Sequence, residues 1–232
     1  MPDRHPDRTN GEEEMTTTRT AILALAPLVF AGAAHAGFVG YTVESSITAG
    51  VTTHRVYAQF NGAGDTVLRA YNIHSVSGGL DGFLHNDLVS GGLSAVAGSW
   101  NPNFALSSGT DSFLAIGGAV GLGAGNTTLP DAGWIMGWNQ PGIPDLASTG
   151  IAGWYNHLTE NQQGRADAGG RVLLAQFVLN TGHAARTISL RLSHNTGFGT
   201  AVTESEGTFA LVPTPGAIAL LALAGVAARR RR

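Results

Sequence analysis

The sequence predicts an all-β protein: a single antiparallel β-sandwich or jelly-roll-like domain over residues 37–211, flanked by an N-terminal signal helix and a C-terminal hydrophobic helix. Three observations lead to this prediction. Short runs rich in β-branched and aromatic residues recur along the chain. Glycine-containing turns separate these runs, and no window of useful length within the domain has helical periodicity. Many short strands with frequent turns are typical of sandwiches and jelly rolls.

The N-terminus has the pattern of a secretory signal peptide over residues 15–36. A short positively charged leader precedes an apolar run from residue 21 to 33, and Ala34 and Ala36 form a small-x-small cleavage site. We therefore expect signal peptidase to cleave before Gly37, in an exported protein.

Residues 1–14 do not fit this pattern. They are polar and end in three consecutive glutamates, and acidic charge at that place is wrong for a signal peptide. We expect Met15 to be the true initiator and residues 1–14 to be a start-site artefact. A genuine disordered extension is the alternative.

Six runs are expected to form the strands of the domain. Residues 54–60 and 66–73 are joined by five turn residues, which predicts a hairpin. Further strands are expected within residues 111–116, 171–180, 187–193 and 203–211, and residues 133–170 are expected to be mostly loop. Because side chains alternate between the faces of a strand, the residues expected to face the core are Val56, Leu68, Ile116, Leu174, Phe177, Ile188, Leu190 and Leu192.

The C-terminal tail, residues 212–232, has three parts. A Pro-rich turn comes first, formed by Val212, Pro213, Thr214, Pro215 and Gly216. An apolar, helix-favouring stretch and four arginines follow, and the expected anchor residues are Ala217, Leu220, Leu221, Leu223, Val226, Arg229, Arg230, Arg231 and Arg232. Residues 216–228 number 13, whereas a comfortable membrane span needs roughly 20. A transient membrane segment with a cytoplasmic arginine anchor is expected, and a buried C-terminal helix is the alternative.

The tail resembles the PEP-CTERM sorting signal of Gram-negative bacteria, which combines a Pro-rich motif, a transmembrane stretch and a basic end. Thr214 stands where the commonest form has glutamate, and Pro-Thr-Pro-Gly resembles a variant found in part of the family. The resemblance implies that exosortase, an integral-membrane enzyme, processes the tail. It also implies a final location at the cell surface or in the extracellular matrix, after transient anchoring in the membrane.

The composition of residues 37–211 excludes two kinds of chemistry. Six arginines and no lysine stand against eleven acidic residues, a net charge of −5. Nucleic acid is therefore not expected as a partner, because a basic face is the footprint of such binding. The chain has no cysteine, which rules out thiol catalysis, thiolate metal sites and disulfides.

Two candidate sites stand out in the domain. Asp81 and Asp87 lie in its densest polar loop, where oxygen ligands would suit calcium. A surface loop capped by its own Asp and Asn side chains is the alternative. Trp134, Trp138 and Trp154 cluster in the long loop segment and could stack against sugar rings if they are exposed. The alternative is that they close one end of the core.

Neither a His-x-x-x-His pair nor a Gly-x-Ser-x-Gly motif is present, so no catalytic residue is predicted. The leading interpretation is a non-enzymatic exported surface or matrix protein that associates with extracellular polysaccharide. A carbohydrate-binding module that uses the three tryptophans is the second hypothesis. A secreted hydrolase, which would need two carboxylates across a cleft, is the third.

Overall fold

The computed structural model describes residues 37–48, 50–86, 92–95, 98–105, 109–132, 134, 138–139, 142–143, 145, 153–197 and 199–213. All of them belong to one compact unit, residues 34–232. They form eleven β-strands and two single-turn 3-10 helices, and all the paired strands are antiparallel. The prediction of an all-β protein is confirmed. The expected signal helix and C-terminal helix lie outside the described residues.

Along the chain the elements are β1 (Phe38–Thr48), β2 (Val51–Phe60), β3 (Thr66–Ser77), β4 (His85–Asn86), β5 (Leu93–Ser94), η1 (Pro102–Phe104), β6 (Phe113–Leu114), β7 (Thr128–Pro130), β8 (Gly153–Asn156), η2 (Thr159–Asn161), β9 (Arg171–Asn180), β10 (Arg186–Asn195) and β11 (Thr203–Leu211). Two predicted runs match β9 and β11 end for end. Three others lie within β2, β3 and β10. In the run predicted at 111–116, only two residues are in a strand, those of β6.

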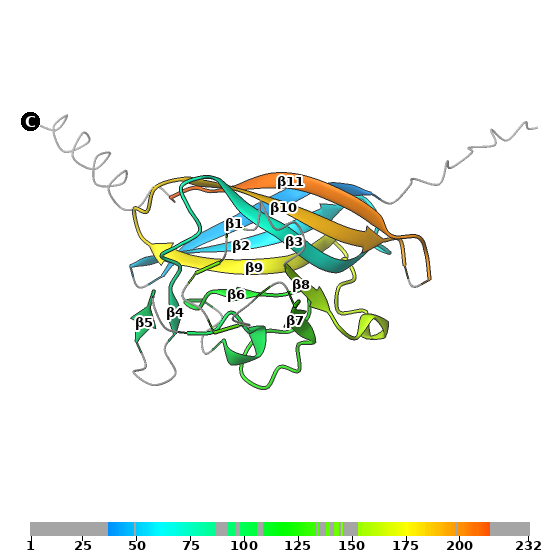
Figure 1. Ribbon diagram of the computed structural model, residues 1–232, viewed down its shortest axis with the longest axis horizontal. Helices are drawn as coiled ribbons and strands as arrows, with labels where there is room; N and C mark the ends of the chain where they lie inside the picture. Colours follow the sequence, from blue (N-terminus) through cyan, green and yellow to red (C-terminus); the bar gives the residue numbers. More distant parts are fainter. Residues whose placement is uncertain are drawn as a thin grey trace, which may run out of the picture. The chain divides into compact units, whose positions relative to one another are not determined.

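The strands are arranged in two larger sheets and one small one. The first sheet has the order β1-β2-β9-β6, the second has the order β11-β10-β3-β8-β7, and β4 pairs only with β5. The two larger sheets face each other in a sandwich-like arrangement (Figure 1). Phe177 of β9 stacks on Phe209 of β11 across the gap, with ring centroids 6.2 Å apart. The hydrophobic core therefore lies between these sheets.

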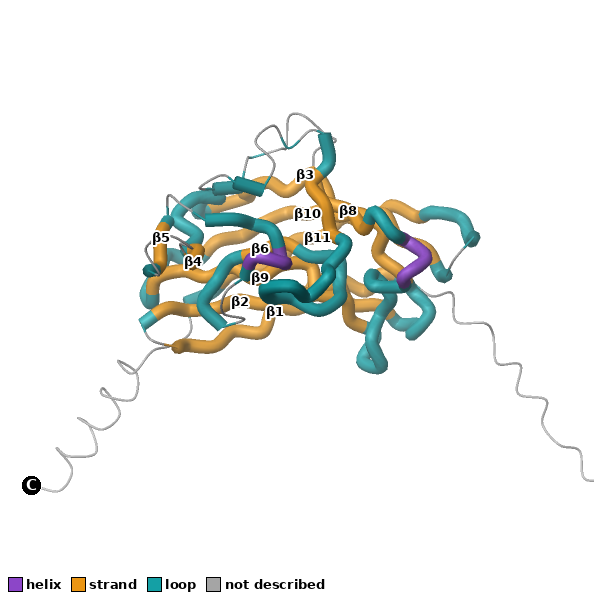
Figure 2. Tube along the Cα trace, turned by 90° about the horizontal axis from the view of Figure 1, so that it is seen from below, coloured by secondary structure: helices purple, strands orange, loops and turns teal. Residues whose placement is uncertain are grey.

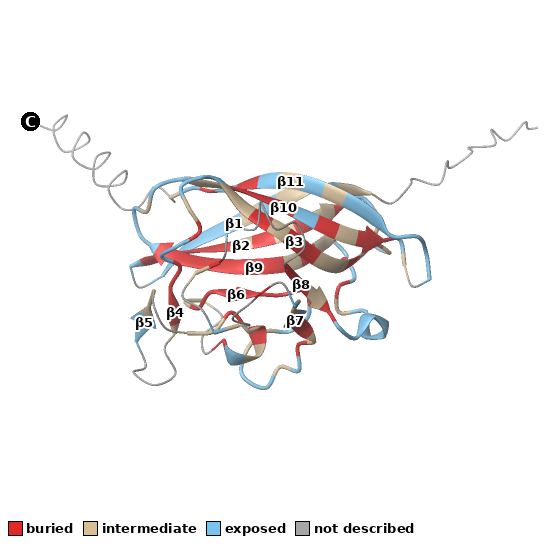
Figure 3. Ribbon diagram, viewed as in Figure 1, coloured by how far each residue is buried: buried red, intermediate tan, exposed pale blue. Residues whose placement is uncertain are grey.

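The outer face and free edge of β9 are also covered. Loops and short strands that precede β9 in the chain lie against its sheet, as the view from below shows (Figure 2). The Leu84 amide donates to the Val178 carbonyl, and β6 pairs with β9 at Gln176 and Ala175. Burial on both faces explains why this strand is a nearly continuous apolar run in the sequence. By contrast, most of β11 is exposed on its outer side (Figure 3).

The hairpin predicted for residues 54–60 and 66–73 is wrong. β2 pairs with β1 and β9, whereas β3 pairs with β10 and β8, so the turn between them carries the chain from one sheet to the other. The physical reason lies in the core: Phe60 before the turn and Val67 after it are both buried in the same core cluster. A corner between the sheets allows both side chains to face it.

Seven of the eight residues predicted to face the core are buried, and Leu68 is the exception. Ser193 and His194 are consecutive on β10, but their partners on β3 are Arg69 and Val67, which leaves Leu68 as an extra residue. This β-bulge breaks the alternation of side chains, so Val67 faces the core and Leu68 faces outward.

The bulge predicts unequal losses of stability for two neighbouring substitutions. Val67→Ala should lower the free energy of unfolding by about 2 kcal/mol, because it removes fully buried methyl groups. Leu68→Ala, at the partly exposed position, should cost under about 1 kcal/mol. Urea denaturation of both variants checks this, and a larger cost at Leu68 would contradict the assignment of the bulge.

Within residues 133–170, which were expected to be mostly loop, the structure describes one strand and one 3-10 helix, β8 and η2. β8 pairs with β3 and β7 inside the second sheet, and its Trp154 is fully buried. In the part of the chain that the structure describes, no helix is long and apolar enough to cross a membrane. The expected membrane segment at 217–228 lies outside that part.

Candidate functional site

The predicted tryptophan platform does not form. Trp134 and Trp154 are buried, with 2% and 0% of their surface exposed, and their rings meet edge to face at 6.1 Å. Trp138 is partly buried, packs against the same core and lies 6.2 Å from Trp134. Stacking on a sugar needs an open ring face, so the prediction is wrong for Trp134 and Trp154. These residues help to form the core, as the alternative held.

The predicted calcium loop receives no support from the residues that can be placed. The Asp81 carboxylate is 93% exposed and lies 3.8 Å from the guanidinium of Arg186. Asp87 lies outside the described residues. Over the described ranges, no three acidic or histidine side chains come together in a way that could hold a metal ion. Asp81 therefore acts as a surface ion-pair partner.

Of the two predicted processing sites, the structure describes only the residues next to the domain: Gly37 at the N-terminal site, and Val212 and Pro213 at the C-terminal one. Gly37 is tied to the turn after β2: its amide donates to Asn61 Oδ1 at 2.7 Å, and its carbonyl accepts from the Asn61 amide at 3.2 Å. Val212 and Pro213 follow directly on β11. Ala34, Ala36, Thr214, Pro215 and Gly216, together with all the predicted anchor residues from Ala217 to Arg232, lie outside the described residues.

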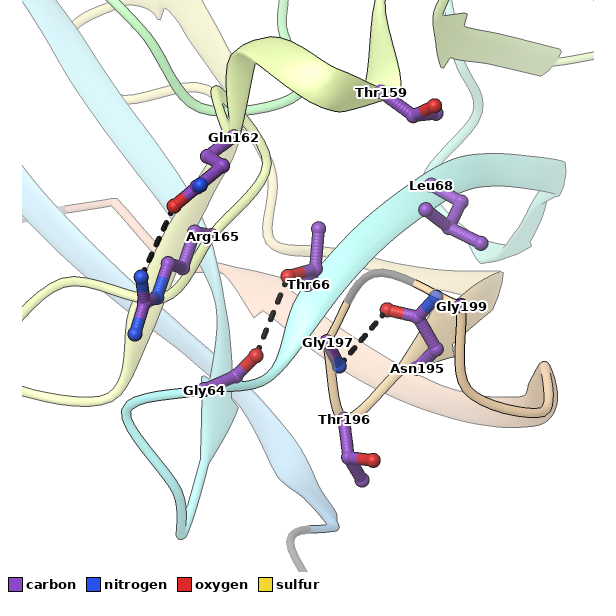
Figure 4. A pocket seen from close by; sticks show the side chains of 10 residues that line it. All are labelled: Gly64, Thr66, Leu68, Thr159, Gln162, Arg165, Asn195, Thr196, Gly197 and Gly199. Carbon is purple, nitrogen blue, oxygen red and sulfur yellow. Dashed lines mark hydrogen bonds between the residues drawn. The ribbon is translucent and has the colours of Figure 1, made fainter.

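A pocket of about 350 Å³ (Figure 4) lies beside the turn between β2 and β3, the same turn to which Gly37 is hydrogen-bonded. Three segments far apart in the sequence meet there: the turn into β3, the segment from η2 to residue 165, and the turn after β10. The lining residues are Gly64, Thr66, Leu68, Thr159, Gln162, Arg165, Asn195, Thr196, Gly197 and Gly199. Sequence reasoning did not find this site.

Local backbone contacts fix the middle segment of this pocket. Gln162 follows η2 in a left-handed conformation, with φ of 57°, and its carbonyl accepts from the Arg165 amide at 2.9 Å. The Val67 amide donates to the Gly164 carbonyl at 2.8 Å, and a Cβ at Gly164 would lie only 2.1 Å from the Val67 carbonyl oxygen. Only glycine permits so close an approach. As a result, Arg165 is held beside the first residues of β3.

Among the described residues that line the pocket, Arg165 is the only one with an ionised side chain. Four other arginines lie within 4.0 Å of a carboxylate: Arg69, Arg171, Arg186 and Arg191. Within the described ranges Arg165 has no carboxylate at that distance. Its Nε donates to the Ala63 carbonyl at 3.2 Å, and one Nη donates to Gln162 Oε1 at 3.0 Å. The pocket is thus locally positive on an acidic domain.

A buried polar group lies at the same end of the sandwich but does not line the pocket. His194 Nε2 lies 2.9 Å from Ser205 Oγ, and the buried Asp65 interacts electrostatically with the His194 ring. Burial raises the pKa of Asp65 and lowers that of His194. The order Ser205, His194, Asp65 is that of the catalytic triad of a serine hydrolase. Within the described ranges, however, no hydrogen bond joins Asp65 to His194, so the triad is not complete. Because Asp65 and His194 are both buried, the group belongs to the interior of the sandwich.

A second polar group lies at the opposite end; its His54 is fully buried, whereas Ser45 and Ala184 are exposed. His54 and His183 face each other with their Nε2 atoms 2.9 Å apart, while Ser45 Oγ lies 2.7 Å from His54 Nδ1 and the Ala184 carbonyl lies 2.8 Å from His183 Nδ1. A carbonyl only accepts hydrogen bonds, so the contact with Ala184 requires a proton on His183 Nδ1. With two neutral imidazoles, His183 Nε2 then accepts from His54 and Ser45 donates to His54. This hydrogen-bonded chain, Ser45–His54–His183–Ala184, joins β1 and β2 to the turn after β9.

Comparison of the chain with protein-family models, with curated proteins and with solved structures gave no match. Fold and function are therefore inferred from the residues of this chain.

Proposed function

We propose that this chain is a non-enzymatic, exported surface or matrix protein, sorted through an exosortase-type C-terminal signal and associated with extracellular polysaccharide. The observation that carries the proposal is the order of its parts. A signal-peptide pattern ends at residue 36, β1 begins at Phe38, β11 ends at Leu211, and the Pro-rich motif starts at Val212. In this arrangement the two processing patterns directly flank a strand-rich domain, and neither falls within it.

The tail supports sorting through its chemistry. Pro213 and Pro215 cannot continue β-pairing or helix, so they separate the last strand from the apolar stretch. The four terminal arginines would hold the end of the chain on the cytoplasmic side. Exosortase would then act between the folded domain and the anchor, and signal peptidase would act at the other end.

The pocket supports contact with polysaccharide. Hydroxyl and amide side chains from Thr66, Thr159 and Asn195 line it, and these groups both donate and accept hydrogen bonds, as sugar hydroxyls require. Leu68, which the bulge turns outward, adds apolar surface to the same wall. In the carbohydrate-binding alternative, this pocket therefore replaces the tryptophans as the candidate sugar-binding site.

We expect the exported protein to begin at Gly37 and to lack the apolar stretch and arginines after Pro215. Mass spectrometry of protein recovered from the cell surface or matrix checks both ends. A variant with Pro213 and Pro215 replaced by alanine is the matched control, and it should keep Arg232 and stay in the membrane fraction. An exported chain that retains Glu12, or a final product intact through Arg232, would contradict the proposal.

A further inference from the structure

The pocket carries a charge that polysaccharide contact alone does not explain. The domain has a net charge of −5 and places carboxylates beside Arg69, Arg171, Arg186 and Arg191. At the pocket, Arg165 has no carboxylate within 4.0 Å among the residues that the structure describes. Arg165 is exposed to solvent at this site, and a cation without a counterion attracts an anion.

The guanidinium of Arg165 is also held in place before any ligand arrives. Its bonds to the Ala63 carbonyl and to Gln162 Oε1 use two of its five N–H groups and fix the plane of the guanidinium. The remaining N–H groups are available to a ligand. A planar guanidinium matches the two oxygens of a carboxylate, which it can bind through a pair of parallel hydrogen bonds.

The groups around Arg165 suit the rest of a sugar ring. Thr66 and Asn195 lie on neighbouring strands, and Thr159 comes from η2, so hydroxyl and amide groups line the pocket to one side of Arg165 (Figure 4). We propose that the pocket binds a carboxylated sugar, a hexuronic acid unit of an acidic polysaccharide, with Arg165 on its carboxylate. This inference rests on the proposed function and specifies the polysaccharide class.

The test uses the full-length chain and two matched probes. A trimer of galacturonic acid carries free carboxylates, and its methyl ester keeps the same sugars without the charge. Isothermal titration calorimetry should show that the acid binds at least tenfold more tightly than the ester. Arg165→Gln should remove that preference, because it deletes one charge-assisted pair while leaving the neutral lining intact. Arg165→Lys should keep part of it.

Arg191→Gln is the control for loss of one exposed arginine, since Arg191 lies on β10, pairs with Glu206 and does not line the pocket. It should leave the preference unchanged. Equal binding of acid and ester would overturn the inference and leave the proposed function standing. Failure to bind either trimer would overturn the inference and would remove the pocket as the point of polysaccharide contact. Binding of inorganic phosphate as tightly as the acid trimer would also overturn it, because the site would then recognise anions and not sugars.

Discussion

Replacing Trp154 with alanine should lower the free energy of unfolding by about 3–5 kcal/mol, the range for large aromatic residues in a core. The side chain is fully buried, and its indole Nε1 donates to the Ala115 carbonyl at 2.9 Å. Through this bond it joins β8 of the second sheet to the segment that begins with β6 in the first. The substitution would therefore leave a cavity and also an unpaired carbonyl inside the protein.

Guanidinium denaturation followed by circular dichroism measures this loss. Trp154→Phe should cost less, because a phenyl ring still fills most of the space, although the N–H donor and part of the indole are lost. Trp138→Ala is the matched control for deletion of an indole, and its partly buried side chain should make the loss smaller. A cost near zero for Trp154→Ala would mean that the ring lies at the surface, and it would reopen the question of a stacking platform.

The strands that the sequence identified best are those in which local composition and burial agree. β9 is covered on both faces and is apolar almost throughout, and β11 alternates over most of its length. Their limits could be predicted because turns rich in glycine or polar residues precede them. β1 was not predicted, since its sequence mixes Gly40 and Ser45 with β-formers and most of its residues are at least partly exposed.

The arrangement of the strands was less accessible to sequence reasoning. A five-residue turn is compatible with a hairpin and with a corner between sheets, and the two are distinguished by the distant strands with which β2 and β3 pair. The face assigned to Leu68 failed because one extra residue in β3 reverses the alternation. No local pattern marks that bulge, since it arises from pairing with β10, more than 100 residues away.

The candidate site could not be predicted for a related reason. Its three segments are ordinary turns when read one at a time, and none contains a recognisable motif. Arg165 differs from Arg69, Arg171, Arg186 and Arg191 in that no carboxylate of the described residues lies within 4.0 Å of it, which is a property of the folded chain. The tryptophans, by contrast, were conspicuous in the sequence, but large aromatic residues are more often core than surface.

Acidification from pH 6.5 toward pH 4 should destabilise the folded protein through His54. Burial, with a smaller contribution from the neighbouring His183, lowers the pKa of His54 from its usual 6.5 to about 4. Between pH 6.5 and 4, His54 is protonated in the unfolded chain but stays neutral in the folded protein, so the free energy of unfolding decreases as the pH falls through this window. The full shift corresponds to roughly 3 kcal/mol. The physical cause is that the imidazole is fully buried within the chain Ser45–His54–His183–Ala184.

His194 acts in the same direction because burial lowers its pKa as well, whereas the raised pKa of Asp65 opposes it. The contribution of His54 is therefore isolated by comparison with His54→Gln, which cannot titrate. Urea denaturation at several pH values between 4 and 7 should give a shallower dependence of stability on pH in this variant. His157→Gln, at an exposed position, controls for the substitution itself. If His54→Gln leaves the pH dependence of wild type unchanged, His54 is not held neutral by the fold, because a neutral buried histidine must contribute to that slope however stable the variant is.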